Sequence, residues 1–156
     1  MSIFTDIKEL AEGRSQSKEW YRSQLTYGLE SYSGGFEPGD IIFFSYAAAT
    51  EKLPFYDRFP MVRITDRSMN TGHFEGGNLH YLRPSARRAV ANAWAVGGAG
   101  YPRRCHHKYF MSNVNNAYKV NPIDLQNMTP LPVEQFVFNA MGRRIDVPSS
   151  FIWSRV

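Results

Sequence analysis

Hydrophobic residues recur at helical spacing in the first third of the chain. One apolar stripe covers residues 3–11, and a second runs from Tyr21 to Tyr32 on the segment that starts near Ser17. Side chains spaced three and four residues apart lie on one face of a helix. We therefore expect two N-terminal helices, each packing one face against the rest of the domain or, as the less favoured interpretation, against another chain.

Short aromatic runs replace this pattern between residues 37 and 83. The turn Glu37–Asp40 precedes Ile41–Tyr46, which is too short and too aromatic for a helix and predicts a strand. A second strand is expected over Phe55–Tyr56 and Met61–Thr65, with flanking prolines that indicate an edge position or a bend. A third is expected over Asn78–Leu82. The loops between them are too short for crossover helices, so the strands should be antiparallel.

The last third mixes several patterns. Pro84 fits the first turn of a helix that ends at Gly97–Gly98. A short amphipathic helix is expected over Tyr109–Tyr118, followed by extended segments near Tyr118–Val120 and Met128–Val133. The tail carries further apolar residues after a Pro-Ser-Ser turn.

These elements predict one α+β domain, in which N-terminal helices pack on a small, strongly bent antiparallel sheet or barrel. The 156 residues suffice to bury a single core. We assign residues 1–32 to a helical N-terminal segment, 37–83 to the antiparallel sheet core, and 84–156 to mixed helix, strand and extended tail.

The high aromatic content of the chain favours contacts with other proteins. Aromatic residues make up 15% of the chain, more than a small core usually hides, and Tyr and Trp favour interfaces. We take Trp20, Tyr101 and Trp153 as candidate interface aromatics. Only one cysteine, Cys105, is present, which excludes an internal disulfide. Met1–Lys8 does not resemble a signal peptide and no apolar stretch approaches about 20 residues, so we expect a soluble intracellular protein.

Positive charge is concentrated in one segment. No Asp or Glu occurs between Gly76 and Ile123, whereas the formal net charge of the whole chain is only +4. Such a segment tends to face an anionic partner. We favour an acidic protein surface over nucleic acid, and place a merely solvated surface third. The candidate binding residues are Arg83, Arg87, Arg88, Arg103, Arg104 and Lys108.

Catalytic and metal chemistry receive no positive support from the sequence. Four histidines and one cysteine are potential ligands, but Cys105, His106 and His107 are consecutive, whereas zinc sites favour two to four residues between paired ligands. No carboxylate pair stands out as an acid–base couple, and no nucleophile motif is visible. We predict no catalytic residue, no metal and no cofactor.

Three sequence runs carry a family resemblance: Glu37–Tyr46, Leu53–Val62 and Gly77–Pro84. Together they resemble a family of small virion-associated proteins of contractile-tailed, T-even-type bacteriophages. The chain departs from that pattern at Arg83 and at Ala47–Ala49. The resemblance implies a non-enzymatic subunit of the tail, baseplate or neck, present in several copies among other phage proteins. It also implies assembly in the host cytoplasm followed by residence in the virion.

Two alternatives stay open. One is a phage nucleic-acid-binding or DNA-end-associated assembly protein. The other, weaker one is a small-barrel ribonuclease of the toxin type, because Arg58–Val62 resembles the strand that precedes a catalytic Ser or Thr in that family, a role that would fall to Thr65. The intervening Phe59 breaks the expected Arg-Pro pair. Asp57 is expected to be structural, capping a turn or pairing with an arginine.

Overall fold

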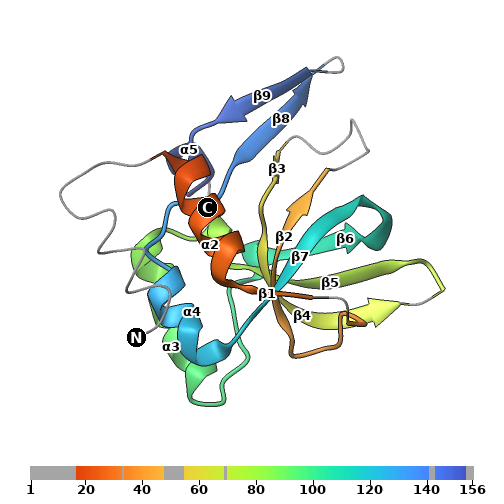
Figure 1. The fold of residues 1–156 in the computed structure, drawn as a ribbon, viewed down its shortest axis with the longest axis vertical. Helices are drawn as coiled ribbons and strands as arrows, with labels where there is room; N and C mark the ends of the chain where they lie inside the picture. The colour runs from red at the N-terminus through yellow and green to blue at the C-terminus, as the bar shows by residue number, and fades with distance from the viewer. Residues whose placement is uncertain (1–16, 33, 48–54, 69, 141–142, 154–156) are drawn as a thin grey trace.

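The computed structural model describes residues 17–32, 34–47, 55–68, 70–140 and 143–153 (Figure 1). The first predicted helix, near residues 3–11, lies outside these ranges. The helices are α2 (Lys18–Gly28), α3 (Pro84–Ala95), α4 (Pro122–Met128) and α5 (Ser149–Trp153), and the short 3₁₀ helices are η1 (Leu79–Tyr81), η2 (Arg103–Cys105) and η3 (Met111–Asn113). The strands are β1 (Glu30–Ser31), β2 (Ile41–Tyr46), β3 (Tyr56–Asp57), β4 (Met61–Ser68), β5 (His73–Asn78), β6 (His106–Phe110), β7 (Val114–Val120), β8 (Phe136–Ala140) and β9 (Arg143–Val147).

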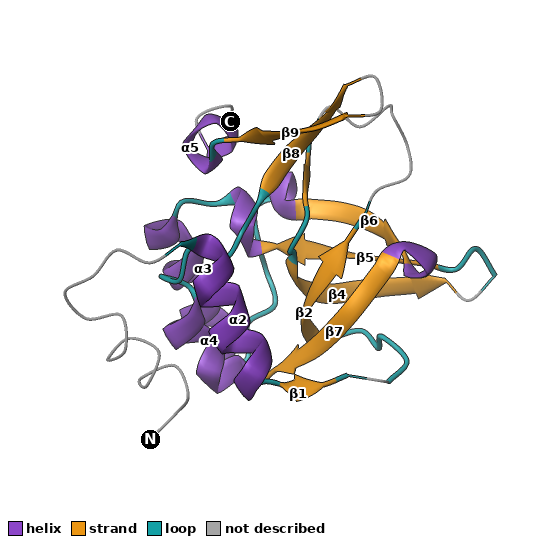
Figure 2. Cartoon of the chain, turned by 45° about the horizontal axis from the view of Figure 1, so that its top comes forward, coloured by secondary structure: helices purple, strands orange, loops and turns teal. Residues whose placement is uncertain are grey.

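Two antiparallel sheets form the β part of the fold. The larger has the order β1-β7-β2-β4-β5-β6, and the smaller has the order β3-β8-β9. Figure 2 shows α2, α3 and α4 gathered beside the larger sheet, and the β8–β9 hairpin extending away from it. The α+β prediction is confirmed, and of its two versions the bent open sheet applies rather than the closed barrel.

Both faces of the central strand β2 are buried, which explains its apolar run Ile41–Phe44. Ile41 and Phe43 pack into a cluster with the helices, together with Leu25 of α2. Ile42 and Phe44 point the other way, into a second cluster inside the bend of the sheet. Alternation of side chains along a strand requires apolar residues at every position when both faces are covered.

Helix boundaries follow local capping chemistry. The Ser17 side chain accepts a hydrogen bond from the backbone N–H of Trp20 and so caps the start of α2. Pro84 occupies the first turn of α3, as predicted. That helix ends where Gly97 adopts a φ of 96° and the N–H of Gly98 bonds to the carbonyl of Ala93. None of the helices in the described ranges is long and apolar enough to cross a membrane.

Four sequence predictions of local structure are wrong. The strand expected over Asn78–Leu82 ends at Asn78, because the Asn78 side chain accepts the N–H of His80 and starts η1. The helix expected over Tyr109–Tyr118 is instead the end of β6, η3 and most of β7. Met128–Val133, expected to be extended, contains the end of α4 and a turn but no strand. Phe55–Tyr56, expected in one strand with Met61–Thr65, instead contributes Tyr56 to β3, which pairs with β8 in the smaller sheet. The predictions for β2, for Met61–Thr65 (β4) and for the end of β7 are confirmed.

Candidate functional site

Five of the six predicted basic binding residues are exposed. Arg83 directly precedes α3 and Arg88 lies within it, whereas Arg103 and Arg104 lie in η2, which packs against η1. Lys108 lies on β6, opposite Glu75 of β5. Among the residues that the structure describes, none of the five forms an ion pair with Asp or Glu. We call this group the cationic set: Arg83, Arg88, Arg103, Arg104 and Lys108.

Arg87, the sixth predicted binding residue, is buried and belongs to the fold. The residue is only 1% exposed, and its Nε donates to the carbonyl of Leu82 at 2.8 Å. Its Nη2 lies 3.3 Å from Oε1 of buried Glu134, which also lies 3.5 Å from Nζ of Lys18. The prediction that Arg87 contacts a partner is therefore corrected: its anionic partner lies within the same chain. The sequence pattern of α3 suggested that Arg87 faces solvent, but the buried face of this helix is formed by Arg87, Ala91 and Trp94.

The buried carboxyl group of Glu134 should make the free energy of unfolding depend on pH. Burial by itself would raise the pKa of this carboxyl, but the positive charges of Arg87, His80 and Lys18 outweigh burial and lower the pKa to about 2, from an ordinary 4.5. A depressed native pKa stabilises the fold above the unfolded pKa, and that contribution is lost as the pH falls from about 4.5 through about 2. The loss should amount to about 3 kcal/mol.

The measurement is the free energy of unfolding against pH for the wild type and for Glu134→Gln. We expect the difference between the two proteins to shrink below pH 4.5, because only the wild type loses the ionised carboxylate. A difference that stays constant from neutral pH to pH 2 would show that Glu134 does not carry this dependence.

Asp57 is the centre of a buried hydrogen-bonded cluster. One carboxylate oxygen, Oδ2, lies 2.8 Å from Nδ1 of His80 and accepts from Nδ2 of Asn78 at 3.0 Å. The other, Oδ1, accepts the backbone N–H groups of Phe59 and Gln135 at 3.0 and 3.1 Å. The predicted turn-capping role is confirmed, whereas the partner of its carboxylate is the His80 ring and not an arginine. Asp57, Asn78 and His80 are 2%, 0% and 2% exposed, so this cluster holds strands together and is closed to solvent.

A second polar cluster lies on the outer side of β4, β5 and β6. The Tyr101 hydroxyl is 2.7 Å from Nδ1 of His106, and Nε2 of the same ring is 3.5 Å from Glu75. The Tyr101 ring lies directly on Gly77, where a Cβ atom would come within 2.5 Å of the ring. Sequence analysis missed this grouping because its members come from two strands and a loop with no common motif.

Thr65, the residue of the ribonuclease alternative, lies beside this cluster in acidic surroundings. Its hydroxyl is 3.1 Å from Oδ2 of Asp66 and 3.3 Å from the carbonyl of Glu75. The Glu75 and Asp66 side chains add negative charge there, which disfavours a phosphodiester.

Histidine and cysteine do not assemble into a metal centre in the described part of the chain: no group of three or more potential ligands occurs there. His106 and His107 point to opposite sides of β6, and His107 stacks on Tyr81 with ring centroids 4.1 Å apart. Cys105 is fully buried, and burial raises the pKa of its thiol to about 11 despite nearby Arg104 and Arg87. A thiol in that state is a poor nucleophile.

The predicted interface aromatics are used mainly inside the chain. Trp20, Tyr101 and Trp153 are all half-buried, and Nε1 of Trp153 donates to the carbonyl of His80 at 3.0 Å. Three other aromatic residues are more accessible: Tyr27 is 92% exposed, Phe110 41% and Phe151 38%. Aromatic content indicated that some rings reach the surface, but not which ones.

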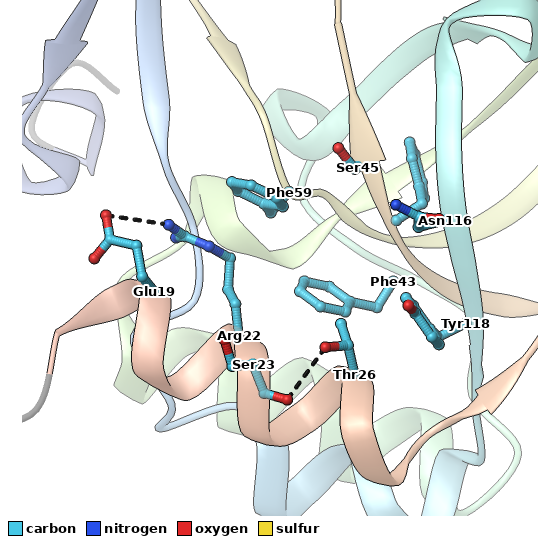
Figure 3. Close-up of a pocket in the computed structure, with 10 residues that line it drawn as sticks. Glu19, Arg22, Ser23, Thr26, Phe43, Ser45, Phe59, Asn116 and Tyr118 are labelled. Carbon is cyan, nitrogen blue, oxygen red and sulfur yellow. Dashed lines mark hydrogen bonds and ion pairs between the residues drawn. The ribbon is translucent and has the colours of Figure 1, made fainter.

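A shallow pocket of about 330 Å³ lies between α2 and the strands β2 and β7 (Figure 3). Its charged lining residues already pair with each other, since Nη2 of Arg22 is 3.5 Å from Glu19. The Arg22 guanidinium also stacks 4.1 Å from the Phe59 ring, and burial lowers its pKa. Asn116, at a bulge of β7 with a φ of 48°, completes the rim. With its ionic groups engaged, the pocket offers a polar rim around aromatic side chains but no poised acid or base.

The exposed cationic set, the closed Asp57 cluster and the small outer cluster are thus the chemical features that the described structure presents. Comparison of this chain with protein-family models, with curated proteins and with solved structures finds no match.

Proposed function

We propose that this chain is a non-enzymatic structural subunit of a tailed bacteriophage particle, in the tail, baseplate or neck. It binds an acidic surface of a neighbouring phage protein through the cationic set. The observation that carries this proposal is the exposure of five basic side chains without an acidic partner in the described structure, in a chain whose other basic residues include several that pair internally. Complementary charge orients such a contact and speeds encounter.

The resemblance to phage virion proteins supports the same proposal in a second way. Two of its three sequence runs meet in the fold at Asp57, Asn78 and His80, which are buried and bonded to one another. Residues in that situation maintain a shape; they do not touch a substrate. A pattern that specifies shape is what a protein needs when its task is to fit among neighbouring subunits.

Removing part of the cationic set should block incorporation into particles. The test variant is Arg103→Ala/Arg104→Ala, because both side chains are exposed and unpaired in the described structure. The matched control is Arg67→Ala/Lys119→Ala, which removes the same charge from side chains that lie 3.0 and 4.0 Å from Glu37 and Asp40. We expect the test variant to fold normally and its copy number in purified particles to fall at least about tenfold, as for several interface charges. The control should be incorporated normally.

Nucleic acid is the competing partner, and the same proteins distinguish it. If the arginines contact phosphates, the logarithm of DNA affinity of the purified wild type should fall by about 0.9 per phosphate neutralised as the logarithm of salt concentration rises. We expect barely detectable DNA binding near physiological salt. Sub-micromolar, salt-sensitive DNA binding that the Arg103→Ala/Arg104→Ala change abolishes, with incorporation into particles unaffected, would overturn the proposal.

A further inference from the structure

Among the residues that the structure describes, no strand pairs with the outer edge of β9, and its faces have little cover. It pairs with β8 on one side only and ends the order of the smaller sheet. Four of its five residues are exposed, including Ile145 at 51%. Figures 1 and 2 both show the β8–β9 hairpin projecting from the body of the protein. A bare edge presents a row of backbone donors and acceptors that can accept another strand.

The sequence of β9 is complementary to itself. The strand reads Arg143, Arg144, Ile145, Asp146, Val147. If two copies pair antiparallel about a twofold axis at Ile145, the two Ile145 side chains face each other. Each Arg144 then lies opposite the Asp146 of the other copy. Directly opposite residues on paired strands have Cβ atoms about 4.5–5.5 Å apart, within reach of an ion pair.

Other central residues are less favourable. A pair centred on Arg144 or on Asp146 would place that charge opposite itself, and like charges directly opposite one another destabilise a sheet. Charged side chains, lysine above all, commonly protect strand edges against association. In β9, by contrast, the positive Arg144 and the negative Asp146 flank the exposed Ile145, and this arrangement favours one defined register.

The arrangement of charges is also compatible with the fold. Asp146 Oδ1 accepts a hydrogen bond from Nε2 of Gln135 at 2.9 Å, which orients the carboxylate and leaves Oδ2 for the second copy. In the described residues Arg144 has no ion pair within its own chain. Both residues are exposed, so pairing requires no opening of the core.

We propose that β9 is a self-association site, at which a second copy of this chain adds its own β9 antiparallel and centred on Ile145. The two small sheets then become one continuous sheet with the order β3-β8-β9-β9-β8-β3. The interface is isologous, the commonest symmetry of homodimers. Two five-residue strands bury less area than the roughly 1,200 Å² at the low end of stable interfaces, so the dimer is weak in dilute solution. High local concentration in an assembly favours it.

Reciprocal charge reversal tests this register. In the Arg144→Asp variant, positions 144 and 146 of each β9 are both acidic. In the Asp146→Arg variant, both positions are basic. We expect sedimentation equilibrium at high protein concentration to show a wild-type dimer, and each single variant to dissociate at least about tenfold more readily. An equimolar mixture of the two variants should restore association, because the aspartate introduced at position 144 of one variant then faces the arginine introduced at position 146 of the other.

Arg143→Asp is the matched control, because position 143 lies opposite Val147 in this register and has no charged partner. It changes the net charge as much as Arg144→Asp does, and we expect its dissociation constant to stay within about twofold of the wild type. A wild type that remains monomeric up to its solubility limit, or a mixture that associates no better than its two components, would overturn the proposal.

This inference does not depend on the proposed partner of the cationic set. The charge-swap experiment uses purified protein alone, whereas the particle experiment changes Arg103 and Arg104. A negative result in one experiment therefore does not contradict the proposal that the other experiment tests.

Discussion

Replacing Arg87 by methionine is expected to lower the free energy of unfolding by about 3–5 kcal/mol, which for a domain of this size approaches the whole of its stability. The change leaves Glu134 with a buried charge, since the Arg87 and Glu134 side chains are 2% and 3% exposed. It also removes donors from the carbonyls of Leu82 and His80. Methionine preserves much of the volume, so the expected loss comes from uncompensated charge and broken hydrogen bonds. Urea denaturation measures it directly.

Two further variants separate this cause from a general effect of changing α3. Arg88→Met alters the adjacent exposed residue and should change stability by no more than about 0.5 kcal/mol. The double variant Arg87→Met/Glu134→Leu removes both buried charges and should recover most of the loss. A double variant as unstable as the sum of its two single changes would mean that the ion pair is not the reason.

Asp57→Ala is expected to be comparably damaging, with a loss of about 3–5 kcal/mol. The alanine would leave the side chains of Asn78 and His80, and the N–H groups of Phe59 and Gln135, without their common acceptor. These groups belong to three segments of the chain, near residues 57–59, 78–80 and 135, and this carboxylate bonds to all three. We therefore expect the melting temperature to fall steeply.

Asp57→Asn keeps one carbonyl acceptor and nearly the same shape, so it should lie between the wild type and Asp57→Ala. Asp66→Ala is the surface control, because Asp66 is exposed, and it should melt within a few degrees of the wild type. Equal melting temperatures for Asp57→Ala and Asp66→Ala would refute the role of Asp57 as the centre of the cluster.

The fold class was predictable because its strongest signals are local. The turn before Ile41 and the apolar run Ile41–Phe44 indicate the strand β2. Pro84 and Gly97 mark the two ends of the helix α3. The segment Tyr109–Tyr118 is misleading because its apolar spacing fits a helix, while pairing with β5 and β2 draws its two halves into strands. Tertiary pairing overrides a weak local pattern.

The candidate site was predictable in its charge and not in its geometry. A segment without acidic residues correctly indicated where exposed cations lie, since five of the six predicted basic residues are exposed. Arg87 could not be separated from them, because its partner Glu134 is 47 residues away. Likewise, the sequence spacing of Tyr101, His106 and Glu75 does not predict that their side chains are in contact. Contacts between residues distant in sequence decide which charges serve the fold and which remain for a partner.

Electron microscopy of purified phage particles that contain this chain tests the central proposal most directly. The account predicts density for the chain at symmetry-related positions in the tail, baseplate or neck, with Arg103 and Arg104 of each copy against acidic side chains of a neighbouring protein. Absence of the chain from mature particles would contradict it. So would copies whose cationic set faces DNA and not protein.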